Sequence, residues 1–218
     1  MNIRVLLADD HQMVREGLRL LLEQQEGIHV VGEATDGLTA VALARELSPD
    51  IVVMDVTMPG LNGIDATRQI INEMKDTRVV ALSVHSDKRY VMEMLKMGAS
   101  GYLMKTSAFD ELVQAIIAVA NGQVYLSPRV AGYVVDAYRG KTKETEQTSA
   151  FSQLTPRERE IVQLLAEGKS TKEIANQLVI SQKTVDVHRQ NTMEKLHLRN
   201  LADLVRYAIK EGLISLDM

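Results

Sequence analysis

The stretch IVVMDVTMPG, residues 51–60, decides how the first half of the chain is interpreted. Four apolar residues, 51–54, run directly into Asp55, and Pro59-Gly60 follow shortly after. A short apolar run of this kind predicts a buried strand. A carboxylate at the end of such a strand requires a reason, because a charge is costly to bury without a partner. Asp55 could be a helix cap, a turn residue or the reactive group of the protein.

The composition of the 218-residue chain bounds the alternatives. Its length predicts two domains, and its 45% hydrophobic and 25% charged residues are ordinary for a globular protein. The absence of Cys excludes disulfides, thiolate catalysis and Cys-based zinc sites. We find no signal peptide pattern and no stretch near the roughly 18 apolar residues of a membrane span, so we expect a cytoplasmic protein without membrane contacts. The net charge of −4 gives no sign of nucleic-acid binding.

Short apolar runs alternate with amphipathic stretches along residues 1–120. The runs are at 3–8, 29–34, 51–54, 79–83 and 101–104, and a helical pattern follows each of them. Five strands, each followed by a helix, predict an α/β fold with a doubly wound, five-stranded parallel sheet that has helices on both faces. In such sheets the carboxyl ends of the strands lie along one edge, and ligands bind there.

This topology would bring polar residues from distant parts of the sequence to one edge. Asp9 and Asp10 follow the first strand, Asp55 the third and Lys105 the fifth, while Ser83 ends the fourth. Converging carboxylates repel one another, which raises their pKa values unless a cation lies among them. Oxygen ligands with no convergent His suit Mg²⁺. With a Lys cation and a Ser hydroxyl nearby, the pattern predicts a phosphoryl site whose nucleophile is a carboxylate.

Each of these residues, taken alone, has a more common explanation. A single Asp after a strand is more often the N-cap of the next helix than a reactive group. Asp10, directly before an amphipathic stretch, could be only that. Ser83 and Lys105 alone would be solvated surface residues. Their combination at successive strand ends is what favours a functional site.

Four motifs resemble the receiver domain of two-component response regulators: ADD at 8–10, MDVTMPGLNG at 54–63, LSVHSD at 82–87 and GYLMK at 101–105. The match extends over essentially all of residues 1–120. The resemblance implies a flavodoxin-like fold in which Asp55 accepts a phosphoryl group from a histidine kinase. It also implies that Mg²⁺ is held by Asp9, Asp10, Asp55 and the backbone carbonyl of Thr57. Ser83 and Lys105 would bind the phosphoryl oxygens, and Tyr102 would be the aromatic residue that turns inward on activation.

A change of composition marks the end of this half. Ser127-Pro128 has the order typical of a helix start, and an amphipathic stretch continues to Gly140. The polar run KTKETEQTSAFSQ, 141–153, has no periodicity and is typical of a flexible linker. We therefore expect a receiver domain at 1–122, a linker helix and flexible linker at 123–152, and a second domain at 153–218.

The second domain contains four signals for helix starts. Residues 155–158 and 170–173 have the sequence of capping boxes, and Ser181 and Asn200 precede two further helical patterns. Four helices, of which the second and third are joined tightly, predict an all-α helix-turn-helix domain. The tetrapeptide 168–171, GKST, matches the end of a phosphate-binding P-loop, but Gln163 stands where that motif needs Gly.

The third of these helices has a polar face that a helical wheel separates from an apolar one. Val185, Thr192 and Leu196 lie on the apolar side. The opposite face and its flanks carry Lys183, Asp186, Val187, His188, Arg189, Gln190, Glu194 and Lys195. This fits a helix in a DNA major groove, with base contacts in the centre and phosphate contacts at the sides. From the wheel alone, an ordinary solvated face explains the pattern equally well.

Residues 154–196 resemble the DNA-binding domain of NarL/FixJ (LuxR-type) response regulators, and the order of the two domains matches that family. The resemblance implies that the last helix dimerises, through Leu201, Leu204, Val205 and Ala208. By the family pattern Lys183, Thr184, Val187, His188 and Gln190 would approach DNA. The helical wheel adds Asp186, Arg189 and Lys195 to this candidate DNA surface. Two positions depart from the family pattern, in which Lys often replaces Asp186 and an apolar residue replaces Thr192. A carboxylate in the groove loses phosphate attraction but can accept from cytosine N4.

We therefore expect a transcription regulator, not an enzyme, that forms a homodimer on phosphorylation and then binds a double-stranded DNA operator. Two alternatives remain. A phosphohydrolase could use Asp55 as its nucleophile, but such enzymes commonly carry an acid Asp two residues later, where this chain has Thr57. The C-terminal helices could instead bind a protein partner, which Asp186 and Glu194 on the candidate face would favour.

Overall fold

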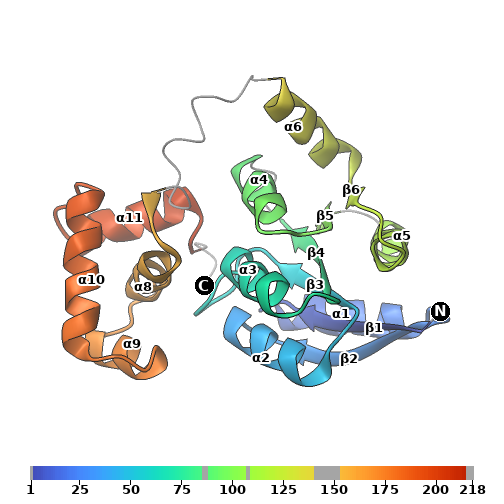
Figure 1. Ribbon diagram of the computed structural model, residues 1–218, viewed down its shortest axis with the longest axis horizontal. Coiled ribbons are helices and arrows are strands. Elements are labelled where there is room, and N and C mark those ends of the chain that lie inside the picture. Colours follow the sequence, from blue (N-terminus) through green and yellow to red (C-terminus); the bar gives the residue numbers. More distant parts are fainter. Residues whose placement is uncertain (1, 85–87, 107–108, 140–152, 215–218) are drawn as a thin grey trace. The chain divides into compact units, whose positions relative to one another are not determined.

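The computed structural model describes residues 2–84, 88–106, 109–139 and 153–214 (Figure 1). The chain divides into two compact units, residues 1–142 and 143–218, and each is described here by itself.

The first unit is built on a parallel sheet. Its strands are β1 (Ile3–Ala8), β2 (Ile28–Ala34), β3 (Ile51–Asp55), β4 (Arg78–Ser83), β5 (Gly101–Met104) and β6 (Tyr125–Leu126), in the spatial order β2-β1-β3-β4-β5-β6. The predicted doubly wound parallel sheet is confirmed, but five strands was one too few. The sixth strand has only two residues, which is too short for an apolar run to reveal.

Helices cover both faces of this sheet (Figure 1). They are α1 (Gln12–Glu23), α2 (Gly37–Leu47), α3 (Gly63–Glu73), α4 (Lys88–Lys96) and α5 (Phe109–Ala120). Side chains of α1 and α5 share one apolar cluster with one face of the strands, while α2, α3 and α4 pack in succession on the other face. All five residues of β3 are buried, so this inner strand is covered on both faces of the sheet.

The sheet continues beyond the predicted boundary at residue 122. β6 pairs with β5, where the Ser127 amide donates to the carbonyl of Tyr102 at 3.2 Å. α6 (Pro128–Tyr138) follows directly and contacts α4. The segment that we assigned to the linker helix therefore packs with the first unit. The predicted flexible linker lies almost wholly outside the described residues.

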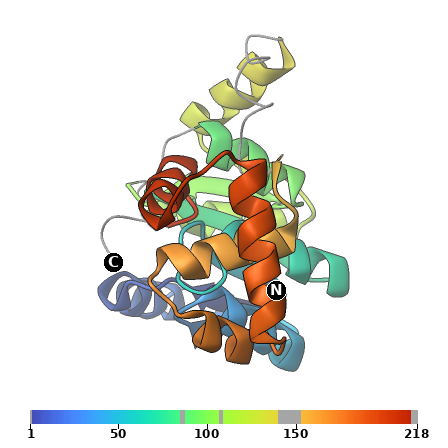
Figure 2. The ribbon, with the colours of Figure 1, turned by 90° about the vertical axis from the view of Figure 1, so that its left-hand side faces the viewer.

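The second unit consists of four helices in its described part: α8 (Pro156–Ala166), α9 (Thr171–Gln177), α10 (Gln182–Lys195) and α11 (Leu201–Glu211) (Figure 2). Both predicted capping boxes form, and Ser181 and Asn200 cap α10 and α11 through their side chains. α9 and α10 are joined by residues 178–181, as a helix-turn-helix requires.

No helix in the described ranges has the length and apolarity that a membrane crossing needs.

Candidate functional site

Asp55 is the last residue of β3 and is only 2% exposed. It does not cap a helix, because α3 begins at Gly63 and is capped by Asn62. Asp10 does not cap a helix either, because the N-cap position of α1 is His11 and no side chain caps that helix. The two carboxylates therefore stand at the sheet edge for a reason other than helix capping.

The neighbouring carboxylate, Asp9, is buried and held firmly in place. Its amide donates to the carbonyl of Ala34 at 3.1 Å, and its own carbonyl accepts from Nη1 of Arg15 at 2.8 Å. Arg15 is fixed in turn by Glu33, with 3.0 Å between Nε and Oε2. The His11 amide donates to Oδ1 of Asp9 at 2.9 Å. These contacts from α1 and β2 orient the carboxylate toward the edge of the sheet.

Lys105 joins the two buried carboxylates. It follows β5, and its Nζ lies 2.7 Å from Oδ2 of Asp55 and 2.7 Å from Oδ2 of Asp9. Its amide donates to the carbonyl of Ser83, at the end of β4, at 2.7 Å. The sheet thus brings together residues that lie 50 and 96 positions apart, and the predicted convergence of Asp9, Asp55, Ser83 and Lys105 is observed.

The charges of this cluster shift one another's ionisation. Burial raises the pKa of Asp55 to about 6; Lys105 opposes this increase, while Asp9 and Asp10 add to it. Burial would lower the pKa of Lys105, but its contacts with Asp55 and Asp9 outweigh that effect and raise it. At neutral pH Asp55 is therefore an anion beside a cation, which is the form that a carboxylate nucleophile needs.

The donor set suits a divalent cation. Asp9, Asp10, His11 and Asp55 each offer a ligand atom, and these atoms all lie within 4.8 Å of one another. Three carboxylates provide the oxygen ligands that Mg²⁺ prefers. Thr57 lies close by, since its amide donates to Oδ1 of Asp55 at 3.4 Å. That its carbonyl is a ligand stays a prediction.

The expectation that no His converges on this edge was wrong. Nδ1 of His11 lies 2.7 Å from Oδ1 of Asp10. His11 stands at the turn from β1 into α1, and this turn places its ring beside the two preceding carboxylates. The signal was present in the sequence as the continuous run ADDH at 8–11.

The remaining predicted receiver residues are buried at or near the same edge. Ser83 ends β4 with no exposed surface, and Tyr102 is fully enclosed in β5. Tyr102 therefore already faces inward in this arrangement. Residues 85–87 of the motif LSVHSD lie outside the described ranges.

In the second unit, the predicted division of α10 into two faces is observed. Val185 and Thr192 are fully buried. Lys183, Asp186, Val187, Arg189, Gln190 and Lys195 are exposed, and Thr184 and His188 are half-buried. That these residues contact DNA stays a prediction.

Two charged residues of this surface already have partners within the unit. Asp186 accepts from Oγ1 of Thr171 at 3.4 Å and lies 3.6 Å from Nη2 of Arg189. Nζ of Lys195 contacts Oε2 of Glu158, in the first capping box, at 3.0 Å. Lys195 therefore ties α10 to the start of α8, a structural role that the sequence did not indicate.

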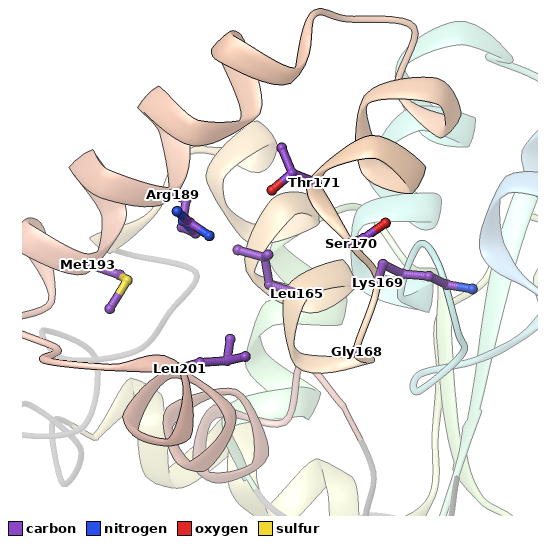
Figure 3. A pocket seen from close by; sticks show the side chains of 8 residues that line it. All are labelled: Leu165, Gly168, Lys169, Ser170, Thr171, Arg189, Met193 and Leu201. Atoms are coloured by element: carbon purple, nitrogen blue, oxygen red, sulfur yellow. The ribbon is translucent and has the colours of Figure 1, made fainter.

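A hollow of about 550 Å³ lies beside α10 (Figure 3). Leu165, Met193 and Leu201 form its apolar part, and Arg189 points into it from α10. Its other wall is the turn between α8 and α9, residues 168–171. Ser170 there forms a capping box with Glu173. Helix α8 occupies the positions before it, where a P-loop needs a strand and a glycine-rich loop, so GKST is not a P-loop. Lys169 also lines the hollow, but its ammonium points away from it (Figure 3).

The predicted dimerisation surface of α11 needs a correction. Leu204 and Ala208 are 0% exposed and belong to the apolar core of this unit, where α11 packs on α8. A side chain enclosed in this way cannot also meet a second protomer. Leu201 is 53% exposed and Val205 is partly buried, so these two remain available.

Comparison with known proteins shows which family has this arrangement. A response regulator receiver domain matches residues 5–117, and the luxR family of bacterial regulatory proteins matches residues 152–208. The chain belongs to the LuxR-type two-component response regulators. Its predicted family is thereby confirmed, and this is a family of transcription regulators with a receiver and a helix-turn-helix DNA-binding domain.

Similar LuxR-type proteins match over nearly the whole chain. The transcriptional regulatory protein LiaR of Bacillus subtilis is 43% identical over 213 residues, which are 98% of this chain and 100% of LiaR. DegU of Brevibacillus brevis is 38% identical, over 97% and 94% of the two chains. RcsB of Salmonella enterica serovar Typhimurium, solved on promoter rprA with the phosphomimetic BeF3−, has a TM-score of 0.62 at 26% identity, over 95% of this chain and 98% of RcsB.

Proposed function

We propose that this response regulator is switched by transfer of a phosphoryl group from a histidine kinase to Asp55. The observation that supports this best is the environment of Asp55. A buried carboxylate at a strand end lies 2.7 Å from the ammonium of Lys105, in a cluster whose donor atoms suit Mg²⁺. Neither helix capping nor a surface role explains that arrangement.

In the proposed reaction, an oxygen of Asp55 attacks the phosphorus of a phosphohistidine. The new O–P bond forms as the N–P bond breaks, and the released nitrogen of the kinase histidine keeps the electron pair and takes up a proton from solvent. Asp55 must be ionised to attack, which a pKa of about 6 allows at neutral pH. Mg²⁺, held by Asp9, Asp10, Asp55 and the Thr57 carbonyl, would supply positive charge to the transferring group.

The product places additional negative charge at a buried edge. Lys105 would then pair with the phosphoryl oxygens, and the Ser83 hydroxyl would donate to them. If these contacts are complete only in the active arrangement of β4 and β5, phosphorylation shifts the population toward it. β6 is bonded to Tyr102 in β5, so a change there reaches α6 directly.

We further propose that active protomers pair and place two α10 helices about one DNA turn apart on the half-sites of an operator. The exposed Lys183, Val187 and Gln190 would approach the bases. Because the exposed face of α10 has few cations for phosphate contacts, and Lys195 already pairs with Glu158, affinity would depend on two linked half-sites. The similar structure of RcsB on promoter DNA supports this function.

The test uses the full chain and a pool of random DNA duplexes, enriched by repeated selection in the presence of an acyl phosphate and Mg²⁺. We expect retention on the selected DNA to rise with phosphorylation, to fall with added salt, and to be unresponsive to the acyl phosphate in Asp55→Asn. The control is Asp76→Asn, an exposed carboxylate after α3. Equal retention with and without the acyl phosphate would contradict the proposed switch.

A further inference from the structure

His11 has an unusual position at the edge of the receiver unit. It occupies the N-cap position of α1 but makes no side-chain bond to that helix. Its Nδ1 instead lies 2.7 Å from Oδ1 of Asp10 and 3.4 Å from Oδ1 of Asp9. About half of the side chain, 55%, is exposed, so the ring can be reached from solvent.

The short contact with Asp10 is made by Nδ1, so this ring nitrogen faces the carboxylates. A cation that bound at Nδ1 would replace that contact. The hydrogen bond and a metal bond are therefore alternatives at the same nitrogen.

The spacing of the donor atoms matches the coordination shell of a small divalent ion. Metal bonds to His nitrogen and carboxylate oxygen are about 2.0–2.2 Å long, which places neighbouring ligand atoms roughly 3.0–3.5 Å apart. The distances of 2.7 and 3.4 Å from Nδ1 to the two carboxylates lie close to that range. The ligand atoms of all four residues fall within 4.8 Å of one another, with Asp55 completing the set.

We propose that His11 is an additional protein ligand in this site, and that it gives the site a preference for divalent ions that accept imidazole, such as Co²⁺, Ni²⁺ and Zn²⁺. Mg²⁺ strongly prefers oxygen, whereas these ions bind imidazole well. The inference rests on the proposed function only in that the same carboxylates would hold Mg²⁺. Mg²⁺ and the imidazole-binding ions would then compete for one site, and His11 would favour the imidazole-binding ions.

Any nitrogen and oxygen site binds these ions more tightly than Mg²⁺, so the informative quantity is the part of the affinity that depends on His11. The experiment measures Co²⁺, Zn²⁺ and Mg²⁺ binding to the full chain by titration calorimetry, and follows Co²⁺ by its visible absorption. The variants are His11→Ala and His11→Asn. The control is His29→Ala, which removes an exposed imidazole near the opposite end of the parallel strands.

We expect His11→Ala and His11→Asn to raise the Kd for Co²⁺ and Zn²⁺ by about tenfold or more, and to change the visible spectrum of bound Co²⁺. The Kd for Mg²⁺ should change by less than about twofold, because imidazole is not a ligand that Mg²⁺ selects. His29→Ala should match the wild type in every titration.

Two results would overturn the proposal: an unchanged Kd for Co²⁺ and Zn²⁺ in the His11 variants, or an equal loss of Mg²⁺ affinity. The second would mean that His11 acts by supporting the loop and not by binding the ion. The proposed phosphoacceptor role is checked separately, by the phosphoryl adduct on the wild-type chain with Mg²⁺. Either claim can therefore fail while the other stands.

Discussion

The carboxylate edge of the receiver unit and the exposed face of α10 carry charge in opposite ways. At the edge, Asp9, Asp55 and Lys105 are buried, and the Lys105 ammonium lies 2.7 Å from each carboxylate. On α10 the charged side chains are exposed, and their partners, such as Arg189 for Asp186, lie 3.6 Å away at the surface.

This difference determines what each region can be used for. The buried ion cluster depends on Lys105, because removing that cation would leave two carboxylates without a partner. Its geometry is therefore set by the fold before any ligand arrives. An exposed ion pair contributes little to stability, so its residues are free to be selected for what they bind.

The largest predicted effect is the loss of the buried cation. Lys105→Ala leaves two buried carboxylates uncompensated, and we expect it to lower the free energy of unfolding by about 3–5 kcal/mol at pH 7.5. The deficit should shrink as pH falls, because Asp55 without Lys105 takes up a proton more readily than in the wild type. Urea unfolding measures both effects.

The matched control is Arg45→Ala, which breaks the exposed pair of Arg45 and Glu73, in contact at 2.6 Å. It should cost less than about 1 kcal/mol. Similar losses for the two variants would show that burial does not distinguish these ion pairs.

The second prediction concerns the pH dependence of Asp55. A carboxyl group whose pKa is raised from 3.8 to about 6 holds its proton more tightly in the folded state, so folding loses stability as pH rises between those values. Asparagine does not titrate. Without divalent cations, Asp55→Asn should therefore exceed the wild type in stability above pH 6 by about 3 kcal/mol.

That difference should disappear toward pH 4, as measured by urea unfolding across the pH range. A difference independent of pH would mean that the carboxylate is not destabilised by its surroundings. Adding Mg²⁺ should narrow the gap at neutral pH, because the wild type keeps all three carboxylate ligands and would bind the ion more tightly than Asp55→Asn.

The third prediction concerns the exposed face of α10. Asp186→Lys places a cation where this chain has a carboxylate, and we expect it to tighten binding to random duplex DNA by about tenfold at low salt, with a steeper dependence on salt. Fluorescence anisotropy measures both quantities. Asp110→Lys, an exposed site at the start of α5, changes the net charge equally. If the two variants behave alike, net charge and not the α10 surface would explain the effect.

The smallest predicted effect is at the turn of the helix-turn-helix. Val179 is 89% exposed and has a φ of 53°, in the left-handed region that β-branched residues avoid. Val179→Asn should stabilise the second unit by up to about 1 kcal/mol, because Asn tolerates this conformation and no buried contact is lost. The thermal transition of the full chain measures the change. A lower melting temperature would show that Val179 contributes packing that outweighs its backbone strain.

The sequence predicted the convergence of charged residues at the sheet edge for a physical reason. Apolar runs that end in charged residues have few explanations, and the rule that parallel strands share a carboxyl edge places Asp9, Asp55 and Lys105 together without any coordinates. Strand β6 was not predicted, because two residues are too few to show a periodic pattern. The run ADDH at 8–11 shows that His11 adjoins the two carboxylates in sequence, but only the turn into α1 shows that its ring faces them.

The second unit was harder to interpret beyond its helices. Capping boxes at Thr155 and Ser170 are local patterns and were predicted correctly. Which residues of α11 are exposed depends on packing. Leu204 and Ala208 share an apolar stripe with Leu201 and Val205. Only the structure shows which of these side chains α8 covers. Contacts with DNA depend on a partner, and neither pattern nor fold determines them fully.

The most direct test of the central claim is the intact mass of the chain after incubation with a small acyl phosphate and Mg²⁺. We predict a single phosphoryl adduct on the wild type and on Asp76→Asn, and none on Asp55→Asn. An adduct on Asp55→Asn, or none on the wild type, would contradict the assignment of Asp55 as the phosphoacceptor.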